Sequence, residues 1–237
     1  MLVIANGMVR SGSTLQYNMA ARLLGTKSDF EKIGFLGDIN DSVHLERIEK
    51  FKIRTNGTAL LKTHSFPKEI EFYESSVYVL FCYRDFRDIA ASIKKKWGWS
   101  FDVIIKRLDN LILLEESIMK LPNVLSQSYD TLFNSPDIAI QEMANFLNLV
   151  ITSSDVIAFK EQLSVSAIRD EVRMTTFAKI KKSIFKKVDF DQDTLLHQNH
   201  ISKTKGQKGD WKNQFSQKEI DILHTRYSGW LSAKNFI

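Results

Sequence analysis

Four short segments of this sequence are almost entirely apolar and rich in residues that favour β-strands. The clearest is Val77–Tyr83, which reads VYVLFCY. Similar runs cover residues 2–6 and 57–63, and a weaker one covers residues 124–129. Strands that are apolar on both faces are typical of parallel sheets buried between layers of helices. The pattern therefore favours a parallel sheet over an antiparallel sheet with one face in water.

Helical patterns lie between these apolar segments. Residues 13–24 follow the first strand, and residues 103–121 carry apolar side chains at helical spacing. Ser135 and Pro136 are typical of an N-cap and a first helical position. The alternation of strand and helix predicts an α/β fold with three layers, α/β/α, around a mostly parallel sheet. We expect one domain covering residues 1–237.

The composition is that of an ordinary globular protein. The chain has 237 residues, of which 43% are hydrophobic and 26% charged, and this excludes a disordered or fibrous protein. Cys82 is the only cysteine, so an internal disulfide framework is excluded. The apolar runs are too short for a membrane span, and the first is too short for a signal peptide. These observations predict a cytoplasmic protein outside the membrane.

The net charge is moderately basic. Lys and Arg total 33 against 28 for Asp and Glu, which gives a formal charge of +5. A basic protein invites a nucleic-acid-binding role, but the lysines form no long tract and suit solvated helix faces. The residues that follow the strands carry more information, because parallel α/β sheets bind ligands at the carboxyl ends of their strands.

The loop after the first strand, residues 7–14, reads GMVRSGST. Its glycine spacing allows backbone N–H groups to converge on an anion at a helix start, as in a P-loop NTPase-like fold. A nucleotide triphosphatase has lysine after the second glycine, whereas this chain has serine there and an arginine inside the loop. We therefore expect phosphate binding without the usual Mg-ATP. The candidate phosphate-binding residues are Arg10, Ser11, Gly12, Ser13 and Thr14.

Two further strand ends carry polar side chains. Lys62-Thr63-His64 follows the second strand, and a neutral imidazole there can accept a proton from an attacking hydroxyl. Arg84 follows the third strand, and Ser92 lies about two helical turns further on. An arginine fork and a serine hydroxyl at this spacing can hold one phosphate together.

A late segment, residues 203–216, reads KTKGQKGDWKNQFS. Its four lysines and two glycines suit either a solvated basic loop or a loop that folds over an anionic ligand. The sequence by itself favours the solvated loop.

Taken in order, these pieces resemble the sulfotransferases that use 3′-phosphoadenosine-5′-phosphosulfate (PAPS). The resemblance spans about residues 2–225, and the segments that carry it are Arg10 to Thr14, Lys62-Thr63-His64, Arg84 with Ser92, Tyr129-Asp130, and residues 205–213.

For the co-substrate PAPS, the resemblance implies two phosphate sites. The 5′-phosphosulfate would lie on the backbone of residues 11–14 with Arg10 beside the bridging oxygen. Arg84 and Ser92 would hold the 3′-phosphate, and Tyr129 would lie near the adenine. The residues implied to close over the 3′-phosphate are Lys205 and Gly206.

For catalysis, the resemblance implies that His64 is the general base and that Arg10 and Lys62 stabilise charge on the departing adenosine 3′,5′-bisphosphate. Glu69 or another acid is an alternative base. The implied reaction moves a sulfuryl group, without a metal, to a hydroxyl or amine of a small-molecule or carbohydrate acceptor. Neither nucleic acid nor a membrane is an expected partner.

Three questions stay open on the sequence. A small P-loop kinase acting on a metabolite with Mg-ATP would also explain residues 7–14, and a nucleic-acid-binding module would explain the charge. The aromatic residues that either line an acceptor site or belong to the core are Trp97, Trp99 and Phe101.

Overall fold

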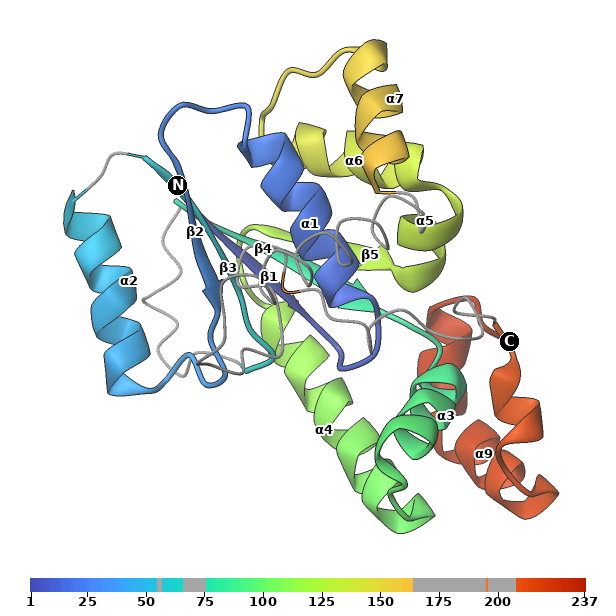
Figure 1. Cartoon of the computed structure of the whole chain (residues 1–237). Coiled ribbons are helices and arrows are strands. Elements are labelled where there is room, and N and C mark those ends of the chain that lie inside the picture. The colour runs from blue at the N-terminus through green and yellow to red at the C-terminus, as the bar shows by residue number, and fades with distance from the viewer. Residues whose placement is uncertain (55–56, 66–75, 164–194, 196–207) are drawn as a thin grey trace, which may run out of the picture.

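The computed structural model describes residues 1–54, 57–65, 76–163, 195 and 208–237. Its centre is a five-stranded sheet with the order β2-β3-β1-β4-β5, in which every pairing is parallel (Figure 1). The strands are β1 (Leu2–Gly7), β2 (Phe30–Phe35), β3 (Thr58–Lys62), β4 (Val77–Tyr83) and β5 (Val124–Ser128). The parallel α/β sheet predicted from the apolar segments is confirmed.

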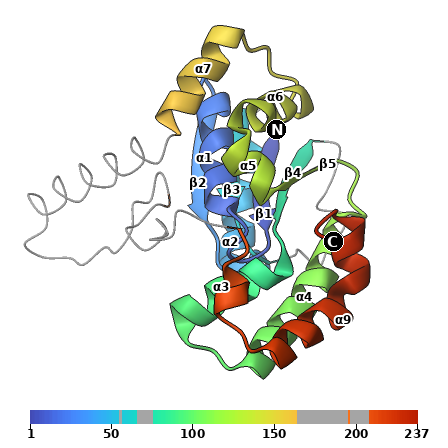
Figure 2. The ribbon, with the colours of Figure 1, turned by 90° about the vertical axis from the view of Figure 1, so that its right-hand side faces the viewer.

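Helices cover both faces of this sheet. The helices of the described residues are α1 (Ser13–Leu24), α2 (Ser42–Arg54), α3 (Phe86–Trp97), α4 (Phe101–Ile118), α5 (Tyr129–Asn134), α6 (Pro136–Phe146), α7 (Ser153–Gln162), the 3₁₀ helix η3 (Asp210–Asn213) and α9 (Gln217–Ala233). Figure 2 shows α1, α5 and α6 on one side of the sheet and α4 and α9 on the other.

Alternate residues of β1 belong to two separate apolar clusters, one on each face of the sheet. Leu2 and Ile4 pack with buried residues of α3, α4 and α9, whereas Val3 and Ala5 pack with buried residues of α1 and α6. This is the period of two that a strand buried on both faces requires. The predicted three-layer arrangement is therefore confirmed.

The sequence did not indicate β2. This strand reads FEKIGF and lies at one edge of the sheet, where Ile33 is buried while Glu31 and Lys32 are exposed. An edge strand with charged residues lacks the continuous apolar run that marked the other four. The helix expected over residues 103–121 is α4, which begins at Phe101 and ends at Ile118.

The register of the sheet brings three strand ends to one edge. Ala5 of β1 lies opposite Lys62 of β3, and Gly7 lies opposite Cys82 of β4. The loop after β1, the residues after β3 and those after β4 therefore emerge side by side. None of the helices that the structure describes combines the length and the apolar surface that a membrane crossing requires.

Candidate active site

The loop after β1 leads into a helix start that has no side-chain cap. Gly12 is the N-cap residue of α1, and the first turn of this helix contains no acidic residue. By contrast, side chains cap four other helices of the described chain, namely Asp85 for α3, Ser128 for α5, Thr152 for α7 and Ser216 for α9. The first N–H groups of a helix have no intrahelical partners and carry partial positive charge. An uncapped start at the ligand-binding edge therefore favours an anion.

The backbone of this loop adopts a left-handed conformation at two residues. Arg10 has φ of 65° and Gly12 has φ of 94°. A Cβ atom at Gly12 would lie 2.8 Å from Cδ2 of Tyr129, so only glycine fits between the ring and the loop. The Arg84 guanidinium lies over the same Tyr129 ring, with its central carbon 4.2 Å from the ring centroid. The Tyr129 ring therefore contacts both Gly12 of the loop and Arg84, which follows β4.

Ser11 stabilises the loop from within. Its N–H donates to the Met8 carbonyl at 3.2 Å, and its hydroxyl lies 2.6 Å from that oxygen and 2.8 Å from the Cys82 carbonyl. The Cys82 thiol donates to the Ser11 carbonyl at 2.7 Å. Because both donors of Ser11 are used inside the protein, the geometry favours Ser13 and Thr14 at the helix start over Ser11 as contacts for an anion.

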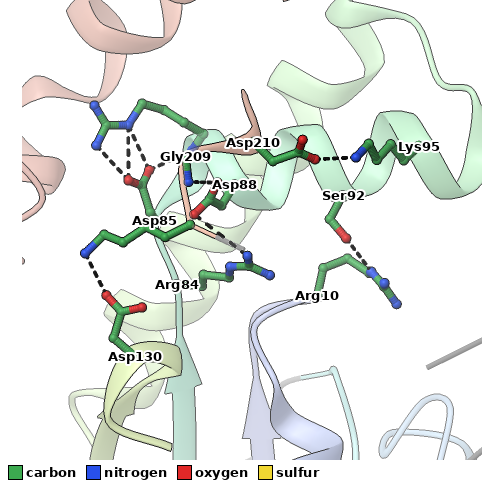
Figure 3. Close-up of polar contacts among 11 residues, drawn as sticks. Arg10, Arg84, Asp85, Asp88, Ser92, Lys95, Asp130, Gly209 and Asp210 are labelled. Carbon is green, nitrogen blue, oxygen red and sulfur yellow. Dashed lines mark hydrogen bonds and ion pairs between the residues drawn. The ribbon is translucent and has the colours of Figure 1, made fainter. Parts of the chain in front are cut away.

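Side chains from α3 join this edge. Arg10 Nε donates to Ser92 Oγ at 2.9 Å, which links the loop to the middle of α3 (Figure 3). Arg84 Nη2 lies 3.8 Å from Asp88 Oδ2, one helical turn further along. The structure therefore brings Arg10, Arg84 and Ser92 to one edge of the sheet, as the sequence spacing predicts.

His64 is bound to the end of β1. Its Nδ1 lies 2.9 Å from the Gly7 carbonyl, so the imidazole donates from Nδ1, and Nε2 is left as the acceptor. Lys62 Nζ lies 3.4 Å from this Nε2. The ring also contacts Phe35 of β2, with a centroid separation of 6.0 Å. His64 thus presents a basic nitrogen next to an ammonium group.

Burial and neighbouring cations change the protonation of this edge. Burial, followed by the charge of Lys62, lowers the pKa of His64 to about 4. Burial also lowers the pKa of Lys62 to about 8. The pKa of Arg10 is lowered by burial and then by the charge of Arg84. At neutral pH the site therefore holds an uncharged imidazole among several like charges, which an anionic ligand would stabilise.

Lys205 and Gly206 lie outside the described residues. The segment that follows them is held by both α3 and α5: Gly209 N–H donates to Asp88 Oδ1 at 3.0 Å, and Lys208 Nζ donates to Asp130 Oδ2 at 2.9 Å. Asp210 pairs with Lys95 (Figure 3). The late basic segment thus ends beside Arg84, whose partner Asp88 is shared with Gly209.

Two residues at this edge, Asp88 and Phe35, were not singled out from the sequence as parts of the site. The role of Asp88 in holding Gly209 depends on a contact between distant segments. Phe35 belongs to the unrecognised edge strand β2. Within the described ranges, no three His, Cys, Asp or Glu side chains gather in the way a metal site needs.

A glycine-containing loop at the carboxyl edge of a parallel five-stranded sheet, with Ser13 in place of the nucleotide triphosphatase lysine and Arg10 inside the loop, defines a P-loop-like arrangement that is suited to an anionic ligand. The sequence model of the sulfotransferase domain matches residues 3–235, so the chain belongs to the sulfotransferase domain family.

Solved structures with the same fold include two proteins in complex with PAP. One is retinol dehydratase in complex with androsterone and the inactive cofactor PAP, at 14% identity, with a TM-score of 0.63 and coverage of 97% of this chain and 80% of that one. Another is mouse sulfotransferase SULT7A1 complexed with PAP, at 17% identity, with a TM-score of 0.63 and coverage of 95% and 82%. At these identities the likeness shows the fold. A comparison with curated protein sequences finds no match.

Proposed function

We propose that this chain transfers the sulfuryl group of PAPS to a hydroxyl or amine of an acceptor and releases adenosine 3′,5′-bisphosphate (PAP). The observation that carries the proposal is the hydrogen bonding of His64 to Gly7, at the start of the loop that leads to the uncapped helix α1. It puts a neutral base and an anion-binding loop at one strand end. The solved structures of retinol dehydratase and SULT7A1, which share the fold, contain PAP.

The residues present fit a ligand with two separate phosphate groups. The start of α1, with Ser13, Thr14 and Arg10, is suited to the 5′-phosphosulfate. Arg84 and Ser92, which follow β4, are suited to the 3′-phosphate, and Tyr129 is suited to the adenine. We assign Lys205 and Gly206 to the 3′-phosphate as well, on the resemblance alone. Anchoring of Gly209 by Asp88 supports a position of the late loop near Arg84.

The chemistry requires a base and a positive charge near one another. PAPS supplies an activated sulfuryl group when it is bound. His64 Nε2 accepts the proton of the acceptor hydroxyl while the new O–S bond forms and the bond from sulfur to the bridging oxygen breaks. Arg10 and Lys62 stabilise the negative charge left on that oxygen, and each such preorganised group contributes a few kcal/mol. The cationic loop fills the role that Mg²⁺ has in a nucleotide triphosphatase.

We assign the acceptor to the small molecules or carbohydrates. Solved retinol dehydratase complexes hold androsterone or retinol, which are small-molecule ligands of that protein. We further propose that residues 1–237 act as a single domain in the cytoplasm. Two apolar clusters on opposite faces of one sheet support the single domain, and the lone Cys82 is compatible with a reducing compartment.

Calorimetric titration with PAP, with and without Mg²⁺, tests the proposed function. We expect binding of equal affinity in both conditions, strong weakening in Arg84→Ala, and no change in Lys120→Ala. The control removes one positive charge just before β5, at the opposite edge of the sheet. Binding of ATP but not PAP, and only with Mg²⁺, would instead support the metabolite kinase. Unchanged PAP affinity in Arg84→Ala would contradict the site assignment.

A further inference from the structure

Asn6 is a buried polar residue in an otherwise apolar stretch of β1. Its side chain is 2% exposed, and the four residues before it, residues 2–5, are all apolar. Asparagine is depleted in strands, and a buried amide is costly unless its donors and acceptor have partners. An apolar side chain would suit the packing of the sheet at this position. The amide of Asn6 therefore needs an explanation outside that packing.

The side chain of Asn6 bonds to the residues on both sides of the candidate base. Its Oδ1 accepts the Gly7 N–H at 2.6 Å, and its Nδ2 donates to the Ser65 carbonyl at 2.8 Å. Gly7 is the residue whose carbonyl lies 2.9 Å from His64 Nδ1, and Ser65 directly follows His64 in the chain. These three hydrogen bonds and the peptide bond between His64 and Ser65 form a closed hydrogen-bonded cycle that includes the imidazole.

The cycle is attached to the strands around it. Gly7 lies against β4, where an added Cβ atom would be 2.8 Å from the Cys82 carbonyl oxygen. Ser65 Oγ accepts the Ile39 N–H, which follows β2, at 2.8 Å. The chain on both sides of the imidazole is therefore held in place, and Asn6 joins these two held segments to each other.

The two hydrogen bonds of Asn6 fix the direction of its amide. If the oxygen and nitrogen of this amide were exchanged, donor would face donor at Gly7 and acceptor would face acceptor at Ser65. The fixed amide in turn holds the Gly7 N–H, and glycine is the residue whose backbone turns most freely when it is not held. Because the Gly7 carbonyl can only accept, the proton of the neutral imidazole lies on Nδ1 as long as this carbonyl keeps its direction.

We propose that Asn6 is a positioning residue for the sulfuryl transfer, which holds His64 in the tautomer that is protonated on Nδ1 and free to accept on Nε2. The inference rests on the proposed function, in which His64 is the base. Asn6 acts through Gly7 and Ser65 and does not itself exchange a proton. Without its amide, the imidazole would turn and carry its proton on either nitrogen. An imidazole protonated on Nε2 cannot accept the proton of a hydroxyl at that atom.

NMR spectroscopy of protein labelled with nitrogen-15 histidine tests this inference in the absence of nucleotide. The two ring nitrogens have different chemical shifts in the two neutral tautomers, and the signals of His64 are those that disappear in His64→Ala. We expect His64 of the wild-type protein to be protonated on Nδ1 at neutral pH. In Asn6→Ala we expect both tautomers to be populated.

Two further variants complete the test. Asn6→Leu also removes both hydrogen bonds, but it keeps a branched side chain that suits a buried strand, and it should give the same mixture of tautomers. Gln127→Ala is the matched control, because it removes another amide that is 2% exposed, on β5 at the opposite edge of the sheet. It should lose stability in thermal melting and leave the tautomer of His64 unchanged. Where neither Asn6 variant folds, slow exchange of the Asn6 amide hydrogens in the wild-type protein is the expected result, and fast exchange would overturn the inference.

The effect on turnover is measured with labelled PAPS. We expect Asn6→Ala to turn over about 10- to 10²-fold more slowly, the size expected when a reacting group loses its alignment. PAP affinity should stay within about twofold of the wild-type value.

The outcomes separate this inference from the proposed function. His64 protonated on Nε2 in the wild-type protein, or on Nδ1 in both Asn6 variants, would overturn the inference. Lower PAP affinity with an unchanged tautomer would assign Asn6 to the phosphate loop instead. Failure of the wild-type protein to bind PAP would contradict the proposed function, and the nucleotide-free spectra would then still show whether Asn6 fixes the tautomer of His64.

Discussion

At the scale of single residues, position in the structure decides which polar groups can react. His64 is kept neutral by burial and by Lys62, and its donor to Gly7 fixes Nε2 as the acceptor. The sequence indicated His64 and Lys62 because they follow a buried strand. It did not show that Ser11 uses both of its donors inside the loop, since Met8 and Cys82 become its partners only when β1 and β4 pair.

Replacement of His64 by alanine is expected to reduce kcat by about 10²–10⁴-fold, the usual contribution of a general base. PAP affinity should remain near the wild-type value, because the nucleotide contacts are elsewhere. Rates with labelled PAPS and calorimetry with PAP measure the two effects. His44→Ala is the control that removes an imidazole of α2, where the ring is bonded to the Asp38 carbonyl. Retained turnover in His64→Ala would shift the base to a carboxylate such as Glu69.

Replacement of Lys62 by arginine is expected to change the alkaline limb of the pH profile. In the wild-type enzyme, kcat/KM should rise as His64 loses its proton near pH 4 and fall as Lys62 loses its charge near pH 8. Arginine stays charged well above that range, so the fall should move to higher pH. Rates between pH 4 and 10 test this. An unchanged alkaline limb in Lys62→Arg would show that another group titrates there.

At the scale of elements, the helices and strands that could be predicted were those marked by an apolar run or by residues typical of a helix start. The strands buried on both faces follow from hydrophobicity, and the helix start at Pro136 follows from the preference of proline for the first helical position, although the Ser135 side chain forms no cap hydrogen bond. Edge strand β2 lacks a continuous apolar run, and helix α7, which has no buried residue, lacks an apolar face although Thr152 and Asp155 form a capping box at its start. The contact between Asp88 and Gly209 joins residues far apart in the chain, and no local pattern reports it.

The start of α1 allows an element-scale prediction. Gly12→Ala forces an L-residue into φ of 94° and places Cβ against Tyr129, so we expect a loss of at least about 1 kcal/mol in unfolding free energy and about tenfold weaker PAP binding. Gly98→Ala is the matched control. Gly98 also has positive φ, but nothing lies within 4 Å of the added Cβ. The control should lose stability alone; equal losses of binding would contradict the role of the loop.

At the scale of the whole molecule, the parallel architecture follows from the apolar strands, but their order does not. Crossover connections determine that β1 lies between β3 and β4, and that arrangement brings His64, Arg84 and the loop together. The sequence predicted which residues follow each strand. That these residues meet at one edge was inferred from the general behaviour of parallel sheets. The register of the strands now shows which residues lie opposite one another at that edge.

Nucleotide binding should stabilise the whole fold. Several like charges meet at one edge, so PAP at about 100 times its Kd should add about 2.7 kcal/mol and raise Tm by about 5–10 °C. Differential scanning fluorimetry measures the shift. We expect it to be insensitive to EDTA and smaller at high salt, because salt screens charge interactions. A shift that appears only with Mg²⁺ would contradict metal-independent binding.

Cys82 of β4 is fully buried and donates its thiol hydrogen to the Ser11 carbonyl of the loop between β1 and α1. Burial raises the pKa of this thiol to about 12. In this structure the thiol is neither accessible nor ionised at neutral pH, so alkylating reagents should leave the native protein unmodified. Modification would require the β1–α1 connection to lift away from β4. The rate of thiol labelling therefore reports how often this connection opens, and a bound nucleotide should lower that rate.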